Sequence, residues 1–354
     1  MVPSLSNTTQ GAIIASAFFV PVLTYLYFTK TQRPQSTAGP LPEPTEVTAL
    51  YIHPIKSCHG ISVQSAKLLP TGLDLDRQWM WVSYPSFEFL TIRNNSRMTL
   101  IRPTYDASTD TLTVTALAPN TIDEKLEFAI PAHPTKEWLN QNTEKHDAKI
   151  WSVTTPARVY SSKLTEPFNA FFGQEVRLVY KASQFDAPRP LGSNGAPHLL
   201  GREASTCFPD MMPLLIGSAS SLSELNTRLD SEIDVRRFRP NILVSGDAAA
   251  PWDEDRWKTV KISPKGKHGG MPLTFDVTQR CARCRVPNVD PDTAEEDKKE
   301  PWETLVKYRR VDEGIKFKPC FGMLCVPREG GKIKVGDRVE VLEVTDGHRY
   351  IPGF

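Results

Sequence analysis

The segment Arg280-Cys281-Ala282-Arg283-Cys284-Arg285 carries the clearest chemical signal in the chain. Its two cysteines lie three residues apart, and three arginines flank them. Nearby positive charge favours the thiolate over the thiol, and a thiolate is a soft ligand for zinc, copper, iron–sulfur clusters and other thiophilic metals. The segment therefore indicates a metal site whose arginines would suit an anionic cofactor beside the metal. Two ordinary buried thiols at a strand edge are the alternative interpretation.

A second cysteine pair, Cys320 and Cys325, could complete a zinc site of four thiolates. The four residues between these two cysteines make the spacing looser than the usual zinc pattern of paired C-x-x-C motifs. Three arginines beside a site that already holds Zn²⁺ are also electrostatically unfavourable. A thioredoxin-like redox pair would need a βαβ context, which the sequence does not indicate. A metal other than zinc is favoured for the Cys281–Cys284 segment.

Two other segments carry groups that bind anions. Lys56-Ser57, with Asp76-Arg77 further on, supplies an ammonium, a hydroxyl and a planar guanidinium, which together bind phosphate well. Phe238-Arg239-Pro240-Asn241 supplies a guanidinium and an amide next to a rigid proline, a combination that can bind a heterocycle edge and an anionic group. Each segment alone is also typical of a solvated turn or of a loop that enters a strand.

A β-rich body has to bring these segments together. Thirty prolines and 20 glycines predict short elements and few long helices. A capping box at Ser221-Leu222-Ser223-Glu224 predicts a helix to about Leu229, and Pro301 at a first helical position predicts a helix over 302–308. We predict an α+β, β-rich fold with barrel closure. Its expected strands cover residues 47–53, 78–82, 111–117, 177–180, 242–244, 273–277 and 338–342.

The N-terminus has the pattern of a membrane anchor. No charged side chain occurs from Met1 to Thr29, and the run from Gly11 to Phe28 is long enough, at about 1.5 Å per helical residue, to span a hydrocarbon layer of about 30 Å. Lys30 follows the run, whereas a cleaved signal peptide carries its positive charge before the apolar stretch. We therefore expect an N-terminal transmembrane helix within residues 1–33 and a flexible linker over 34–46, with the folded part in the cytosol. A buried N-terminal helix of the globular body is the alternative.

Charge and cysteine content exclude two classes of protein. The 42 Lys and Arg nearly balance the 41 Asp and Glu, so the formal charge is +1 and no basic excess is present to attract nucleic acid. Six cysteines in 354 residues are too few and too uneven for a disulfide scaffold. We expect no nucleic acid among the partners.

Taken together, the motifs resemble those of the MOSC-domain family, especially its membrane-anchored, amidoxime-reducing members. The shared motifs occur in the family's order from about Val47 to Leu342. They are Lys56-Ser57, Asp76-Arg77, Phe238-Arg239-Pro240-Asn241, Cys281-x-Arg283-Cys284, Val289-Asp290-Pro291-Asp292-Thr293, Lys299-Glu300-Pro301, Phe321-Gly322 and Ile333-Lys334-Val335-Gly336-Asp337. The resemblance implies a MOSC N-terminal β-barrel region over 47–184, a MOSC β-barrel domain over 185–345 and a tail over 346–354. It also implies a molybdenum cofactor held between the two regions.

The resemblance also implies roles for individual residues. Cys284 corresponds to the cysteine that binds molybdenum and is thus the expected catalytic residue. Relatives often have serine at the position of Ala282 and a hydroxyl residue at that of Met211, so these contacts depart from the family pattern. The expected contacts to the pterin cofactor, including its phosphate, are Lys56, Ser57, Arg77, Asp210, Met211, Arg239, Asn241, Ala282 and Arg283.

The implied activity is the reduction of N-hydroxylated substrates such as amidoximes and hydroxylamines, with nitrite or nitrate as further candidates. Electrons must come from outside the chain, because the sequence has no flavin or haem motif of its own. The resemblance implies cytochrome b5 and its NADH-dependent reductase as the donors. The implied location is the mitochondrial outer membrane, with the endoplasmic reticulum as the alternative. Two other functions stay open: a sulfur carrier with a persulfide on Cys284, and a membrane-tethered protein that binds the cofactor without catalysis.

Overall fold

The computed structural model describes residues 38–119, 123–266 and 270–353. From Leu41 on, the described residues form one compact unit. The predicted transmembrane helix lies within residues 1–33, outside the described residues. Among the residues that are described, no helix is long and apolar enough to cross a membrane.

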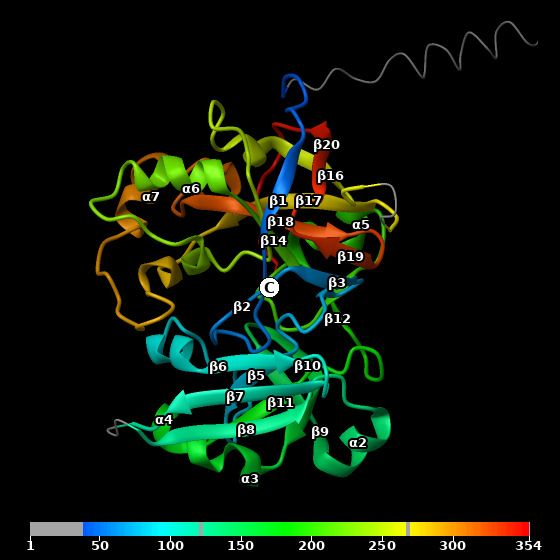
Figure 1. The fold of residues 1–354 in the computed structure, drawn as a ribbon, viewed down its shortest axis with the longest axis vertical. Helices are drawn as coiled ribbons and strands as arrows, with labels where there is room; N and C mark the ends of the chain where they lie inside the picture. Colours follow the sequence, from blue (N-terminus) through cyan, green and yellow to red (C-terminus); the bar gives the residue numbers. More distant parts are fainter. Residues whose placement is uncertain (1–37, 120–122, 267–269, 354) are drawn as a thin grey trace, which may run out of the picture. The chain divides into compact units, whose positions relative to one another are not determined.

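A closed β-barrel forms the larger part of the compact unit (Figure 1). Within the described residues, seven strands follow one another in the order β15, β14, β18, β17, β16, β20 and β1, and β1 pairs with β15 to close the ring. The prediction of a β-rich fold with barrel closure is confirmed. The barrel strands are β1 (Thr45–Ile52), β14 (Leu214–Ser218), β15 (Ile242–Val244), β16 (Trp257–Ser263), β17 (Leu273–Ala282), β18 (Cys320–Pro327) and β20 (Arg338–Val344).

One pair of neighbouring barrel strands is parallel and is joined by a crossover connection. β14 and β15 run parallel, with Ile216 opposite Ile242, whereas the other pairings of the barrel are antiparallel. Parallel neighbours need a long connection, usually through a helix. Here the connection contains α6 (Ala219–Asn226) and the 3₁₀ turn η4 (Val235–Phe238). Arg239 is the C-cap residue of η4 and lies three positions before the first residue of β15.

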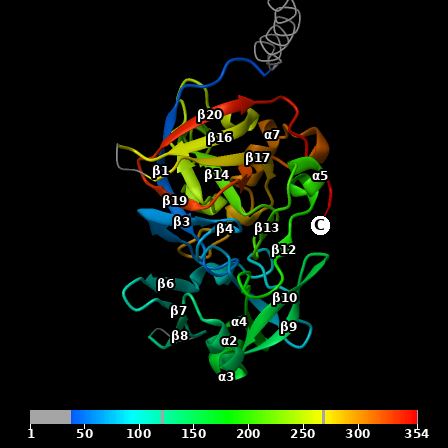
Figure 2. The ribbon, with the colours of Figure 1, turned by 90° about the vertical axis from the view of Figure 1, so that its right-hand side faces the viewer.

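The first strands belong to the barrel side of the molecule. β2 (Ile61–Val63) pairs with β1, and β3 (Ser65–Leu69) lies between β4 (Gly72–Leu73) and β19 (Gly331–Lys334). Strand pairing therefore crosses the boundary expected near residue 184, because residues 45–73 pair with strands from the C-terminal half. Both ribbon views place β3 between the barrel and the β6–β8 sheet (Figure 2).

The remaining N-terminal strands form two sheets, where the resemblance implies a barrel-like region. The four-stranded sheet has the order β5-β11-β10-β9, and the three-stranded sheet has the order β6-β7-β8. Trp81 of the first sheet packs against Phe128 of the second, with ring centroids 6.1 Å apart. The strands are β5 (Trp79–Ser83), β6 (Arg102–Asp106), β7 (Thr111–Leu117), β8 (Lys125–Pro131), β9 (Thr143–Ile150), β10 (Val153–Tyr160) and β11 (Val176–Tyr180), and a short pair is formed by β12 (Arg189–Pro190) and β13 (Ser205–Thr206).

Helices are short, as the proline content predicts. The helix expected over 302–308 is α7 (Trp302–Tyr308), although Pro301 precedes the helix as its N-cap residue. The predicted capping box is wrong: α6 begins at Ala219, and Ser221 inside it donates to Glu254 Oε2 at 2.8 Å. The other α-helices are α2 (Lys136–Asn142), α3 (Ser162–Thr165), α4 (Asn169–Phe172) and α5 (Pro197–Leu200). The 3₁₀ turns are η1 (Ser96–Leu100), η2 (Glu166–Phe168), η3 (Ser193–Gly195), η4, η5 (Asp253–Arg256), η6 (Val286–Asn288) and η7 (Glu313–Ile315).

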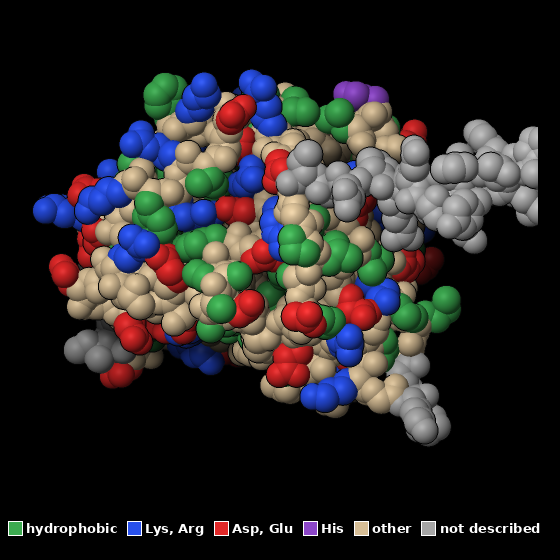
Figure 3. Space-filling model, turned by 90° about the horizontal axis from the view of Figure 1, so that it is seen from above, with side chains coloured by type: hydrophobic (Ala, Val, Ile, Leu, Met, Phe, Trp, Pro, Cys, Tyr) green, Lys and Arg blue, Asp and Glu red, His purple; other side chains and the backbone are tan. Residues whose placement is uncertain are grey.

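The C-terminal segment is fastened to the body. Tyr350 N donates to Asp312 Oδ1 and Ile351 N donates to Asn194 Oδ1, each at 2.9 Å. Residues expected to form a tail thus contribute to the body. Cationic and anionic side chains are interspersed over the face seen from above in Figure 3, in keeping with the balanced charge of the sequence.

Candidate functional site

A cavity of about 350 Å³ brings the predicted site residues together. Its wall is formed by the turns around residues 56 and 77, the segments 91–93, 209–215 and 238–241, and the end of β17 with the residues that follow it. All ten residues predicted from the sequence line this cavity: Lys56, Ser57, Arg77, Asp210, Met211, Arg239, Asn241, Ala282, Arg283 and Cys284. Their roles toward a ligand remain predictions.

The two cysteines of the Cys281–Cys284 segment have different surroundings. Cys281, the second-to-last residue of β17, accepts a hydrogen bond from Arg283 Nη1 at 2.9 Å and packs against an apolar cluster that includes Leu215 and Leu324. Cys284 lies beyond the strand, within hydrogen-bonding reach of Arg93. Both cysteines therefore line the cavity next to a guanidinium, but Cys281 belongs to β17 and packs among apolar side chains, whereas Cys284 lies in the loop beyond the strand.

Cys320 and Cys325 do not join this site. Both side chains are buried in β18, and burial raises the pKa of the Cys320 thiol to about 12. Neither cysteine lines the cavity. Within the part of the chain that the structure describes, no three His, Cys, Asp or Glu side chains gather as a set that could hold a metal ion. The alternative of a four-cysteine zinc site therefore has no structural support.

Asp210 forms ion pairs with two cationic side chains at the cavity. Lys56 Nζ donates to the Asp210 carboxylate and to Phe208 O, the latter at 2.9 Å, and Arg93 Nη2 donates to Asp210 Oδ2 at 2.7 Å. Burial works to raise the pKa of Asp210, but the charges of Lys56 and Arg93 hold it well below its usual range. Burial also lowers the pKa of Lys56 to about 8, although Asp210 opposes that shift. Asp210 thus orients Lys56 rather than offering the cavity a free negative charge.

Arg77 is fixed by the protein itself. Its Nη1 donates to Asp76 Oδ2 at 2.6 Å and to Asn241 Oδ1 at 3.2 Å, and its Nη2 donates to the backbone oxygen of Arg239 at 3.0 Å. Burial would raise the pKa of Asp76, but the Arg77 charge and hydrogen bonds from His53 lower it to about 2. Asn241 Oδ1 also accepts from Leu215 N at 3.1 Å. Arg77 and Asn241 therefore tie β15 to the turn that precedes β5.

Arg239 differs from Arg77 because part of its guanidinium is unsatisfied. Its Nη2 is buried and has no hydrogen-bond partner within the described residues. Burial, followed by the charge of Arg77, lowers the pKa of Arg239 to about 10. An unpaired buried donor on a cation is costly, so this group is arranged for a partner that the protein does not supply.

Three of these residues have a left-handed backbone. The φ angles are +69° at Ser57, +48° at Arg77 and +57° at Arg239. Side-chain-bearing residues rarely adopt this region, and such strain tends to gather at binding and active sites. The local sequence does not require it, so long-range contacts must hold these loops.

The cavity wall carries a large excess of positive charge. Asp210 is the one carboxylate among the lining residues, against six cationic residues: Lys56, Arg77, Arg93, Arg239, Arg283 and Lys318. Sequence reasoning missed Arg93, Trp151, Lys318 and Tyr350, which also line the cavity. Arg93 and Asp210 are 117 positions apart, so no local pattern could have paired them. The arrangement fits a ligand that carries negative charge.

The molybdenum cofactor implied by the sequence can be tested against this wall. Such a cofactor combines a metal that accepts a thiolate ligand with a pterin and a phosphate. The cavity supplies Cys284 beside Arg93, an excess of cations, and the unpartnered Nη2 of Arg239. Its volume also lies in the usual range of small-molecule sites. The residues of the cavity wall therefore fit a molybdenum cofactor.

Comparison with known proteins gives the class of the chain. Residues 45–175 match the MOSC N-terminal beta barrel domain, and residues 203–340 match the MOSC domain. The chain belongs to the MOSC-domain family. Within that family it is 30% identical over 307 residues to mitochondrial amidoxime reducing component 2 of Bos taurus, covering 83% of this chain and 82% of the relative. It is 31% identical over 305 residues to mitochondrial amidoxime-reducing component 1 of Homo sapiens, covering 84% and 82%.

Proposed function

We propose that this protein binds a molybdenum cofactor through Cys284 and reduces N-hydroxylated compounds, namely amidoximes and hydroxylamines, with nitrite or nitrate as further candidate substrates. The observation that carries the proposal is the convergence of Cys284 and six cationic side chains on one cavity. The names of the relatives support the reaction class, because those proteins are described as amidoxime-reducing components.

Each group on the wall has a distinct task in this proposal. When bound, the molybdenum cofactor supplies the two-electron redox chemistry that removes the N-hydroxyl oxygen. Cys284 holds the metal, and Lys56, Arg77 and Arg239 balance the negative charge of the phosphate and pterin ends. Arg93, within hydrogen-bonding reach of Cys284, orients the cysteine. Met211, a flexible apolar side chain on the wall, is proposed as a further cofactor contact.

Electrons have to come from a partner protein. We propose cytochrome b5 and its NADH-dependent reductase as donors, since the sequence contains neither a dinucleotide-binding nor a haem-attachment motif. The test is benzamidoxime reduction by the purified chain with cytochrome b5, its reductase and NADH, together with metal analysis. We expect turnover and about one molybdenum per chain. A molybdenum-free protein with a persulfide on Cys284 would favour the sulfur-carrier function, and bound molybdenum without turnover would favour a cofactor-binding protein.

Retention of the cofactor should weaken as the pH rises above about 8. Lys56 loses its charge in this range, because burial lowers its pKa to about 8. A bound anion raises that pKa, so by linkage the affinity falls as the pH rises from the pKa of the free site to that of the bound site. The measurement is molybdenum remaining after dialysis between about pH 7 and 9. Lys56→Met has no titrating amine and should bind more weakly with a flatter pH profile; an equally steep profile in this variant would contradict the assignment.

We propose that residues 1–33 anchor the protein in the mitochondrial outer membrane and leave the folded unit in the cytosol. The charge-free apolar run supports the anchor, and the relatives are named as mitochondrial. Deleting residues 1–33 should leave thermal stability and benzamidoxime turnover unchanged, because the first barrel strand begins at Thr45. The full chain should resist carbonate extraction from membranes and the deletion variant should not. Loss of folding or cofactor in the deletion variant would assign the apolar run to the core.

A further inference from the structure

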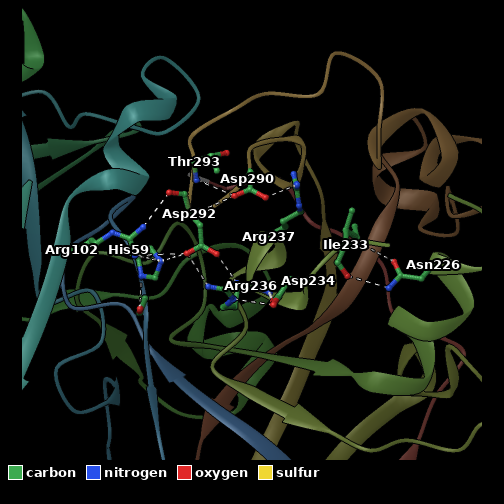
Figure 4. A network of polar contacts seen from close by, with 11 residues as sticks. His59, Arg102, Asn226, Ile233, Asp234, Arg236, Arg237, Asp290, Asp292 and Thr293 are labelled. Carbon is green, nitrogen blue, oxygen red and sulfur yellow. Dashed lines mark hydrogen bonds and ion pairs between the residues drawn. The ribbon is translucent and has the colours of Figure 1, made fainter. Parts of the chain in front are cut away.

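The motif Val289-Asp290-Pro291-Asp292-Thr293 has no part in the cavity wall, yet it forms a compact polar loop close to it. Asp290 Oδ1 accepts the N–H groups of Asp292 and Thr293 at 2.9 and 3.1 Å. Its other oxygen accepts from Arg237 Nη2 at 2.8 Å. Asp290 thus shapes the loop, and the Asp292 carboxylate projects from it toward neighbouring segments (Figure 4).

Asp292 meets side chains from both of the loops that carry predicted cofactor contacts. His59 Nε2 lies 3.0 Å from Asp292 Oδ1, and Arg236 Nη2 donates to Oδ2 at 2.8 Å. Arg102 of β6 adds a third link, from its Nη2 to the backbone oxygen of Asp292 at 3.1 Å. Figure 4 shows His59 and Arg236 converging on this carboxylate from opposite sides. The Asp292 carboxylate therefore joins two segments that are distant in sequence, and the backbone oxygen of the same residue binds a third.

His59 and Arg236 are close in sequence to residues that line the cavity. His59 follows Ser57 by two residues, and Arg236 precedes Arg239 by three. Arg239 is the C-cap residue of η4, where its N–H donates to Arg236 O at 3.0 Å. Both Ser57 and Arg239 have the left-handed backbone described above. Their loops need contacts from outside to keep that conformation.

Packing alone does not hold these loops together. A second cavity, of about 160 Å³, separates them and is lined on its sides by His59, Gly60, Arg236, Arg239 and Pro291. The Asp292 contacts bridge the two loops at this cavity. The link is therefore electrostatic at a point where side-chain packing is incomplete.

We infer that Asp292 is a positioning residue for the cofactor cavity, which ties the Lys56–Ser57 loop to the Arg239 loop through His59 and Arg236. The identity of the cavity's occupant rests on the proposed function, whereas the link between the loops does not. An ion pair with exposed members is individually weak. The two carboxylate contacts, to His59 and to Arg236, act together on one ordered loop, so their joint loss is expected to be measurable.

The test compares Asp292→Asn with Asp110→Asn. Asparagine keeps the size of the side chain but turns an NH₂ group toward cationic donors. Asp110 is a matched control, because its side chain is 44% exposed against 43% for Asp292, and it also pairs with a histidine, His133 Nδ1 at 2.6 Å. We expect molybdenum to leave Asp292→Asn about three- to tenfold faster than wild type during dialysis. Asp110→Asn should match wild type, and Asp292→Glu should recover part of the retention.

Amide hydrogen exchange separates this inference from the proposed function. In cofactor-free protein, Asp292→Asn should exchange faster at residues 55–60 and 235–241, with the amides of β16 and β17 unchanged. A wild-type protein that never carries molybdenum would refute the proposed function. The exchange measurement would still show whether Asp292 holds the two loops together. Unchanged exchange in both loops, or faster exchange throughout the barrel, would overturn the inference. So would an equal loss of molybdenum in Asp110→Asn.

Discussion

Cys284→Ala is expected to abolish benzamidoxime turnover and to purify without molybdenum. In the proposed function Cys284 is the protein ligand of the metal, and alanine offers no atom to replace the thiolate. The side chain lies on the cavity wall beside Arg93, outside the barrel core, so the fold should persist. Activity should fall to the background of the assay, and circular dichroism and the melting temperature should stay close to wild type.

Cys281→Ala is the matched control for that experiment. This change removes the acceptor of the Arg283 Nη1 hydrogen bond but no proposed metal ligand. Arg283 keeps its bond to Phe238 O at 2.7 Å, so its position should be largely preserved. A hydrogen bond from a charged donor contributes about 1.5–3 kcal/mol, which allows at most about a 10- to 150-fold effect and leaves measurable turnover. Equal loss in both variants would indicate a dithiol site instead.

Local sequence patterns predicted strands with alternating apolar residues, as at 111–117, and short runs of β-prone apolar residues, as at 242–244. The expected strands over 111–117 and 242–244 coincide with β7 and β15. β18 was missed, because Cys320–Pro327 is buried at every position and contains a glycine and a proline, so it shows neither alternation nor uniform β propensity. The capping box at Ser221 failed for a tertiary reason: the buried Glu254 carboxylate accepts the hydroxyl that would have capped the helix.

Some residues of the candidate site could be predicted from the sequence more readily than others. Cys281 and Cys284 stand out from residue type and spacing alone. Lys56, Arg77 and Arg239 were weak signals singly and became a site only through the order of several motifs, and the fold then placed all three on one wall. Arg93 carried no signal, since its partners Asp210 and Cys284 come from distant segments. Charge pairing across such separations is a property of the fold and is invisible to a local pattern.

Arg239→Ala is expected to lose the cofactor while keeping its fold. The buried Nη2 of Arg239 has no hydrogen-bond partner among the described residues, so truncation removes an unsatisfied donor from the apoprotein. Loss of one charge-assisted bond to a buried anion costs about 1.5–3 kcal/mol, which corresponds to roughly 10- to 150-fold weaker retention. Molybdenum per chain should fall accordingly. Arg239→Lys should recover only part of it, because lysine keeps the charge but lacks the planar fork.

Arg77→Ala should also lose molybdenum, but it should destabilise the protein as well. Asp76 is buried and relies on Arg77, 2.6 Å away, to stay ionised. Removing one partner of a buried ion pair costs about 3–5 kcal/mol, because the other charge is left unpaired. Urea unfolding of the cofactor-free variants should therefore separate Arg77→Ala from Arg239→Ala. Arg228→Ala serves as the control, because Arg228 follows α6, has a half-exposed side chain and does not line the cavity. If both Arg77→Ala and Arg239→Ala kept full molybdenum occupancy, these arginines could not be cofactor contacts, and the positive cavity wall would need a different ligand.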